Sequence, residues 1–239
     1  MKSEGYELSS RIRDYLLSTL PQLELTLQNN FWDSALWHGR ITGYIAEAGV
    51  KSGFRIELAR RFVVNTKFKT EIDYESFLKA YNALHKLNIN NAMTSNEQYS
   101  TEIDVIYLDP NDNTAIALCE YENKREEIKE NILKFRALVS SNPLKFKPKL
   151  CILGFYASSK DYLESVIKEL IDYIRNWGCN ESVSNTGEAV SKLKPLNCYW
   201  LIIGIYKAPA YTVNCIATIL DPKAIEIDER ETNIGKTVH

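Results

Sequence analysis

The spacing of apolar residues along the chain predicts alternating helices and strands. Residues 6–20 and 22–49 carry apolar side chains at helical spacing, and Pro21 is expected to end the first helix. Residues 54–64 alternate over their first half, which predicts a strand, and residues 73–87 carry one apolar stripe, which predicts a helix. The first part of the chain is therefore expected to be mainly helical, with one strand.

The middle of the chain has the clearest strand pattern. Residues 101–109 and 114–122 predict two strands, and the turn-forming residues Pro110-Asn111-Asp112-Asn113 lie between them. Apolar residues are nearly continuous from Ala115 to Cys119, as in a strand buried on both faces. The expected elements that follow are a helix over 124–141, a strand over 149–156, a helix from Ser158 or Ser159 to Trp177, and strands over 198–207 and 211–220.

This order of elements indicates an α/β fold, with a mixed central sheet flanked by helices and preceded by an N-terminal helical segment. The length of 239 residues suits one domain. Its expected parts are a helical part over 1–50, a core over 51–156, a C-terminal helix and strands over 157–220, and a peripheral polar tail over 221–239.

Composition narrows the classes of protein. The formal net charge is -2, so a nucleic-acid partner would have to be bound by local basic patches or with the help of metal ions. We find no stretch of apolar residues long enough to cross a membrane, and charges interrupt the N-terminus where a signal peptide would be apolar. The chain is therefore expected in the cytoplasm.

The five cysteines are odd in number and form no Cys-x-x-Cys pair. We expect them to behave as small buried apolar residues in a reducing compartment. A zinc site is disfavoured, because none of the three histidines lies at ligand spacing from a cysteine.

Three acids fall at strand ends within the predicted hairpin. A turn near residues 110–113 would place Asp104 beside Glu120 and Glu122, and Lys124 shares their face if the strand continues that far. Carboxylates so close together repel one another, and a cation would resolve the conflict. Hard oxygen ligands suit Mg²⁺ or Mn²⁺, which can activate water for attack on a phosphodiester.

The segments Glu102-Ile103-Asp104-Val105-Ile106-Tyr107 and Ala117-Leu118-Cys119-Glu120-Tyr121-Glu122-Asn123-Lys124 resemble the core motif of the PD-(D/E)XK nuclease superfamily. That motif has an Asp on one strand and an acid-x-Lys at the end of the next, followed by a helix. The resemblance implies a restriction-endonuclease-like fold and a Mg²⁺- or Mn²⁺-dependent endonuclease that cuts DNA. Family members often form homodimers, which the resemblance also implies.

Two registers of the acid-x-Lys motif remain open. Glu120-Tyr121-Glu122 has the apolar middle residue that the family prefers but a Glu in the Lys place, and we favour it. Glu122-Asn123-Lys124 restores the Lys with a polar middle residue. In the favoured register, Asp104 and Glu120 would bind metal with the help of the Tyr121 carbonyl, Glu122 would be a ligand or replace the Lys, and Lys124 would assist at the phosphate.

Other residues are candidates through the resemblance or through charge. A Glu on the helix before the motif often completes the family's metal site, and Glu47 is the candidate, although a surface Glu is the commoner outcome for such a position. Basic residues before the hairpin could bind phosphates or protect a strand edge; they are Lys51, Arg55, Arg60 and Arg61.

Two alternatives to a nuclease are kept. The chain could be a catalytically inactive nuclease-fold module that binds nucleic acid or a protein, in which case the hairpin need not bind metal. It could also be a protein-interaction domain with a solvated hairpin, whose acids pair with nearby basic residues. Those basic residues would be Lys124, Arg125 and Lys129.

Overall fold

The structure is a computed structural model of the chain. It describes residues 3–27, 34–64, 99–122, 131–132, 134–136, 138–139, 146–175, 195–207, 213–221 and 227–231. Side chains of residues 20–27, 34–37, 60–64 and 99–101 fall outside that description, as do those of Phe146, Lys207 and Val213.

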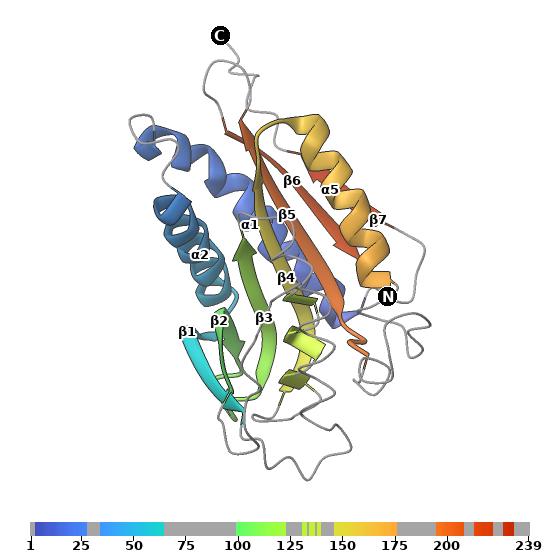
Figure 1. The fold of residues 1–239 in the computed structure, drawn as a ribbon. Helices are drawn as coiled ribbons and strands as arrows, with labels where there is room; N and C mark the ends of the chain where they lie inside the picture. The colour runs from blue at the N-terminus through green and yellow to red at the C-terminus, as the bar shows by residue number, and fades with distance from the viewer. Residues whose placement is uncertain are drawn as a thin grey trace, which may run out of the picture.

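A seven-stranded mixed sheet forms the centre of the protein, and its strands lie side by side in chain order (Figure 1). The strands are β1 (Arg55–Val64), β2 (Tyr99–Leu108), β3 (Ala115–Glu122), β4 (Phe146–Ala157), β5 (Tyr199–Lys207), β6 (Val213–Leu220) and β7 (Ile227–Glu231). Strands β3, β4 and β5 run parallel, whereas the pairs on either side of them are antiparallel. The expected mixed α/β architecture is confirmed at this level.

Helices cover both faces of the sheet (Figure 1). On one face, α1 (Glu4–Leu27) and α2 (Ser34–Lys51) bury an apolar cluster that includes Ile12, Ile45 and Val105. On the other face, α5 (Lys160–Tyr173) packs together with the helical residues 131–132, 134–136 and 138–139, which we call the 131–139 segment. Because both faces are covered, β3, β4 and β5 have the continuous apolar sequences typical of interior parallel strands.

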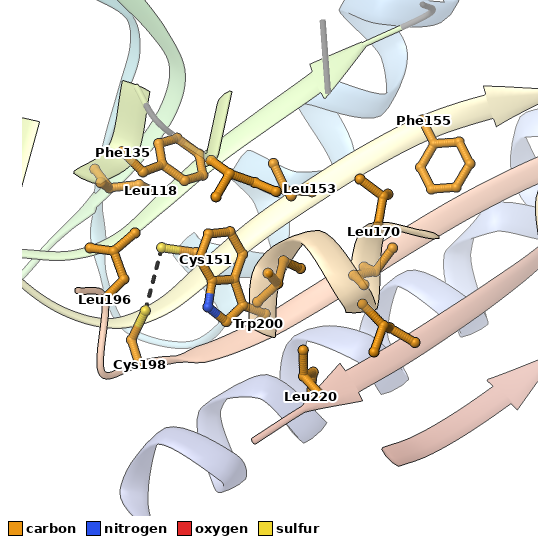
Figure 2. Close-up of a cluster of buried hydrophobic side chains, with 14 of the residues drawn as sticks. Leu118, Phe135, Cys151, Leu153, Phe155, Leu170, Leu196, Cys198, Trp200 and Leu220 are labelled. Atoms are coloured by element: carbon orange, nitrogen blue, oxygen red, sulfur yellow. Dashed lines mark hydrogen bonds between the residues drawn. The ribbon is translucent and has the colours of Figure 1, made fainter. Parts of the chain in front are cut away.

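The apolar cluster under α5 surrounds Trp200, which is fully buried (Figure 2). The Sγ atoms of Cys151 and Cys198 lie 3.5 Å apart beside it. The described cysteines are all free and buried, which confirms their expected apolar role; they are Cys119, Cys151, Cys198 and Cys215. Cys179 lies outside the described residues.

Most predicted elements match the structure, with local differences. Helix α1 continues past Pro21 to Leu27, so the expectation that Pro21 ends the helix was wrong. Proline removes one helical hydrogen bond, but that loss bends or weakens a helix without always ending it. Ser159 caps α5 by accepting a hydrogen bond from the Tyr162 N–H, one of the two caps expected. The helix predicted over 73–87 lies outside the described residues.

The polar segment after Asp221, expected to be peripheral, contributes the edge strand β7. Tyr6, Arg13 and Asp14 of α1 meet Asp228 and Arg230 of β7, and we call these five residues the α1–β7 cluster. The buried Arg13 guanidinium lies 2.9 Å from the Asp228 carboxylate, and Tyr6 Oη donates a 2.6 Å hydrogen bond to the same carboxylate. These contacts fix the N-terminal helix to the last described strand.

Within the described ranges, we find no helix with both the length and the apolar character needed to cross a membrane.

Candidate carboxylate site

The β2–β3 hairpin brings the predicted acids together. The Asp109 N–H donates to the Thr114 carbonyl at 2.9 Å, and the Asp109 side chain accepts from the Asn111 N–H at 2.8 Å, while Asn113 takes the left-handed conformation (φ 58°). This turn pairs Leu108 with Ala115, and a register shift between Tyr107 and Leu108 then pairs Val105 with Cys119. The Tyr121 N–H bonds to Asp104, so Asp104 lies beside the 120–122 segment, as the hairpin interpretation predicted.

The sheet is irregular at Asp104. Pairing between β2 and β3 ends at Val105–Cys119, whereas β3 stays paired with β4 as far as Glu122. The Tyr121 N–H, left without a β2 partner in the ladder, donates instead to Asp104 Oδ2 at 2.9 Å. On the other side of β2, the position opposite Asp104 is Ala59, whose φ of 48° is strained for a residue other than glycine.

The packing shows the same irregularity. Ile103 is buried among residues of the α5 face, but Val105 is buried among residues of the α1–α2 face. Residues two apart in a regular strand share a face, so the chain departs from strand geometry at Asp104. Such distortions re-aim a side chain, and here the carboxylate of Asp104 turns toward the end of β3.

Glu120 is the buried acid of the site, with a side chain only 3 % exposed. Its Oε1 accepts a hydrogen bond from Lys134 Nζ at 2.5 Å. Burial raises the pKa of Glu120 well above its ordinary value, although the Lys134 charge opposes that rise. The acid is therefore not a solvated hairpin residue, which counts against the interaction-domain alternative.

Asp104 has different partners. His38 Nε2, from α2, lies 3.2 Å from Asp104 Oδ2. Burial alone would raise the pKa of Asp104, but the hydrogen bonds from His38 and from the Tyr121 N–H outweigh it and lower the pKa. The hydrogen bond to Asp104 in turn raises the pKa of His38, against the opposing effect of burial.

Glu122 completes the set of acids. Its Oε1 accepts a hydrogen bond from the Asn131 side chain at 3.1 Å. Asn131 and Lys134 are three residues apart on the 131–139 segment, so they share one helix face and reach the two acids that share one strand face. We call Asp104, Glu120 and Glu122, with their partners His38 and Lys134, the carboxylate cluster.

Gly154 helps to place the backbone of Tyr121. It pairs with Tyr121 across β3 and β4, and a Cβ at position 154 would lie 2.6 Å from Tyr121 Cδ2. Any larger residue would collide with this buried ring. The absence of a side chain at Gly154 thus lets Tyr121 lie over β4 on the face opposite Glu120.

Glu47 lies apart from the acids of the hairpin. It follows His38 by nine positions, which is about 13 Å along a helix at 1.5 Å per residue. The contact described for it is a hydrogen bond with Tyr15 of α1, which together with partial burial raises the pKa of Tyr15 to about 12. Helix α2 therefore presents His38, not Glu47, to Asp104.

The predicted basic residues are spread along β1. Lys51 and Arg55 are exposed, and Arg55 pairs with Leu108 near the turn of the hairpin, where it forms a 3.0 Å ion pair with Glu57. The backbone of Arg60 and Arg61 pairs with Ile103 and Glu102, next to Asp104. Lys124, Arg125 and Lys129 lie outside the described residues, so the second acid-x-Lys register stays a prediction.

The sequence interpretation missed the two basic partners of the acids. His38 lies three residues before Ile41 and seven before Ile45, on the buried stripe of α2, and a histidine in that place was a usable signal. Lys134 interrupts the apolar stripe formed by Ile132, Phe135 and Leu138. Spacing alone could not show that either side chain meets the hairpin.

In the described residues, no group of three or more His, Cys, Asp or Glu side chains is arranged to hold a metal ion. The carboxylates instead bond to Lys134, His38, Asn131 and the Tyr121 N–H. Comparison of the chain with protein-family models, curated proteins and solved structures gives no match.

Proposed function

We propose that this protein is a divalent-metal-dependent endonuclease that hydrolyses phosphodiester bonds of DNA, with a restriction-endonuclease-like fold. One observation carries the proposal: Asp104 bonds to the Tyr121 N–H at the point where β2 leaves β3, next to Glu120, whose charge it influences and which bonds to Lys134. The PD-(D/E)XK motif has an acid on one strand, an acid-x-Lys at the end of the next and a helix after it; in the favoured register this chain has Glu122 in the Lys place.

The donor set fits Mg²⁺ or Mn²⁺. Three carboxylates within one hairpin supply the hard oxygens that these ions prefer. Burial raises the pKa of Glu120, so keeping this acid charged in the metal-free protein costs free energy, and a bound cation would lower that cost. Asp104 and Glu120 would hold the ion, with Glu122 as a further oxygen donor.

Other groups of the chain would orient the metal ligands and offset the charge of the phosphate. When bound, the metal ion supplies activation of a water molecule and stabilisation of charge on the phosphate. His38 and the Tyr121 N–H orient the Asp104 carboxylate through Oδ2. Lys134 places a positive charge beside the acids, where it would offset the charge of a phosphate group. The water oxygen would bond to phosphorus and release a proton to solvent, while the bond from phosphorus to the leaving oxygen breaks and that oxygen takes up a proton from solvent.

The test is cleavage of plasmid, linear and branched DNA in the presence of Mg²⁺ or Mn²⁺. We expect cutting by the wild type and a loss of about a thousandfold or more in D104N and E120Q, because each removes a charged carboxylate that would hold the metal ion. Both substitutions keep the shape of the side chain. Asp172→Asn and Glu7→Gln, on exposed positions of α5 and α1, are matched controls that should cut like the wild type.

One observation favours the alternative of an inactive nuclease-fold module. Lys134 and His38 already bond to the carboxylates, and no described group of side chains is arranged as a metal centre. The alternative predicts DNA binding without cutting and no Mn²⁺ binding by calorimetry. DNA cleavage that is lost in D104N and E120Q but kept in both controls would exclude it.

A further inference from the structure

The basic partners of the carboxylate cluster lie where a metal ion would have to bind. Lys134 Nζ is 2.5 Å from Glu120 Oε1, and the Glu120 side chain is 3 % exposed while that of Lys134 is 17 % exposed. Little solvent reaches the pair, so the attraction between the two charges is only weakly screened. Glu120 thus has an internal counter-ion in the metal-free protein.

We propose that Lys134 is a positioning residue that competes with the divalent metal ion for Glu120, so that metal binding requires Lys134 to leave. The proposal rests on the proposed function, because it assumes that Glu120 is a metal ligand. It starts from the observation that Lys134 bonds to Glu120, while the described residues contain no ready metal-binding group.

The chemistry of the two partners supports an exchange. An ammonium group and a hard divalent ion both seek carboxylate oxygens, and two cations cannot share the same buried oxygen without strong repulsion. Lys134 has a long flexible stem and sits on a helix, not on β3, so its head can move while Glu120 stays in place. Once displaced, Lys134 is a free positive charge next to the site, available to a phosphate.

This competition gives an unusual prediction, in which removal of one residue strengthens metal binding. Lys134→Gln removes the competing charge, so we expect it to bind Mn²⁺ roughly tenfold more tightly than the wild type, the effect of losing about 1.4 kcal/mol of charge–charge competition. Lys134→Arg keeps the pair with Glu120 and should bind Mn²⁺ no more tightly than the wild type. Lys168→Gln, on the exposed face of α5, is the matched control and should leave the affinity unchanged.

In the experiment, the whole chain is titrated with Mn²⁺ alone. Calorimetry measures the heat of binding, and the EPR signal measures the Mn²⁺ that stays free. Glu120→Gln identifies the site, because it should abolish the same binding event. A melting curve checks that each variant is folded. If Lys134→Gln does not fold, Lys134→Arg still tests the proposal, because tighter Mn²⁺ binding by the arginine variant would contradict it.

The outcomes separate the two proposals. Tighter binding by Lys134→Gln than by the wild type and by Lys168→Gln supports the competition. Equal or weaker binding by Lys134→Gln, with wild-type binding that depends on Glu120, overturns the competition and leaves the metal site standing. Absence of Mn²⁺ binding by both the wild type and Lys134→Gln at millimolar concentrations overturns the competition together with the proposed function.

Discussion

The α1–β7 cluster and the carboxylate cluster both place charged groups against the apolar core, but their charges balance differently. In the α1–β7 cluster, Arg13 and Arg230 face Asp14 and Asp228 at 2.9 to 3.9 Å, so positive and negative groups are equal in number. Among the described residues, the carboxylate cluster contains three acids, one lysine and one histidine, and the histidine counts only when it is protonated.

The balance has a physical meaning. In the α1–β7 cluster, equal numbers of opposite charges hold a helix against an edge strand, which is a structural role. Removal of one charged residue leaves its partner unpaired. A surplus of acids raises the free energy of the folded protein and is expected where a cation from outside completes the site. We therefore interpret the first cluster as structural and the second as functional, and each of the following predictions tests that distinction.

The largest effect on stability is expected from Arg13→Met. The guanidinium is fully buried, and its loss leaves Asp228 without its closest positively charged partner. Breaking a buried pair costs about 3–5 kcal/mol. Here Asp228 is 34 % exposed, and two guanidinium nitrogens of Arg13 find no hydrogen-bond acceptor in the described residues. We therefore expect the free energy of unfolding to fall by about 2 kcal/mol. Urea denaturation measures it, with the exposed Arg11→Met as control. A loss no larger than that of the control would contradict the structural interpretation.

Asp228→Asn should cost about 1–2 kcal/mol at neutral pH, the usual value of hydrogen bonds to a charged group, less some screening by solvent. Burial alone would raise the pKa of Asp228, but the bonds from Tyr6 and Arg13 lower it. A lowered pKa stabilises the fold above the ordinary Asp value of about 3.9, and that contribution is lost as the pH falls through the folded pKa. Denaturation curves of both proteins from pH 7 to pH 3 should therefore converge below about pH 4; a constant difference would show that charge is not the cause.

Glu120→Gln should change the free energy of unfolding by less than about 1 kcal/mol, and toward greater stability, while it abolishes cleavage. The substitution removes the cost of burying a charge. Lys134 still has the Asp104 charge near it and is 17 % exposed to solvent, so its own charge is not left isolated in the core. Melting curves and the DNA assay on the same preparation measure both quantities. A large loss of stability would place Glu120 with Arg13 as a structural residue.

Glu47→Gln should have the smallest effect, within about 0.5 kcal/mol in stability and about twofold in cleavage rate. Glutamine retains an oxygen that can accept the hydrogen bond from Tyr15. The same urea and DNA assays apply, with Glu7→Gln beside it. A cleavage defect as large as that of Glu120→Gln would return Glu47 to the site, as the family resemblance first implied.

Local patterns predicted the frame of the site but not its partners. The turn residues Asp109 to Thr114 and the apolar run that follows were enough to predict the hairpin and the place of Asp104 beside the 120–122 segment. They act over a few residues, so the sequence carries the signal directly. His38 and Lys134 reach the acids through the packing of α2 and the 131–139 segment, which no local pattern encodes.

The irregularity of β2 also could not be predicted from the sequence. The sequence shows an ordinary alternation through Ile103 and Val105, yet these two side chains pack on opposite faces. The edge strand β7 also lacks a strand signal, because its five residues IDERE are mostly charged. Its place is fixed by long-range pairs with α1, which depend on the completed sheet.

The strict chain order of the strands has a consequence for synthesis on the ribosome. Each new strand can add beside the one made just before it, so the sheet can grow outward from β1 while translation proceeds. The bond between Tyr6 and Asp228 is different, because 222 positions separate the two residues. Arg13 can form its ion pair with Asp228 only after β7 has been synthesised. A nascent chain that stops before Ile227 would therefore lack this contact between α1 and β7. The first and last described elements of the chain can therefore meet only after β7 has been synthesised.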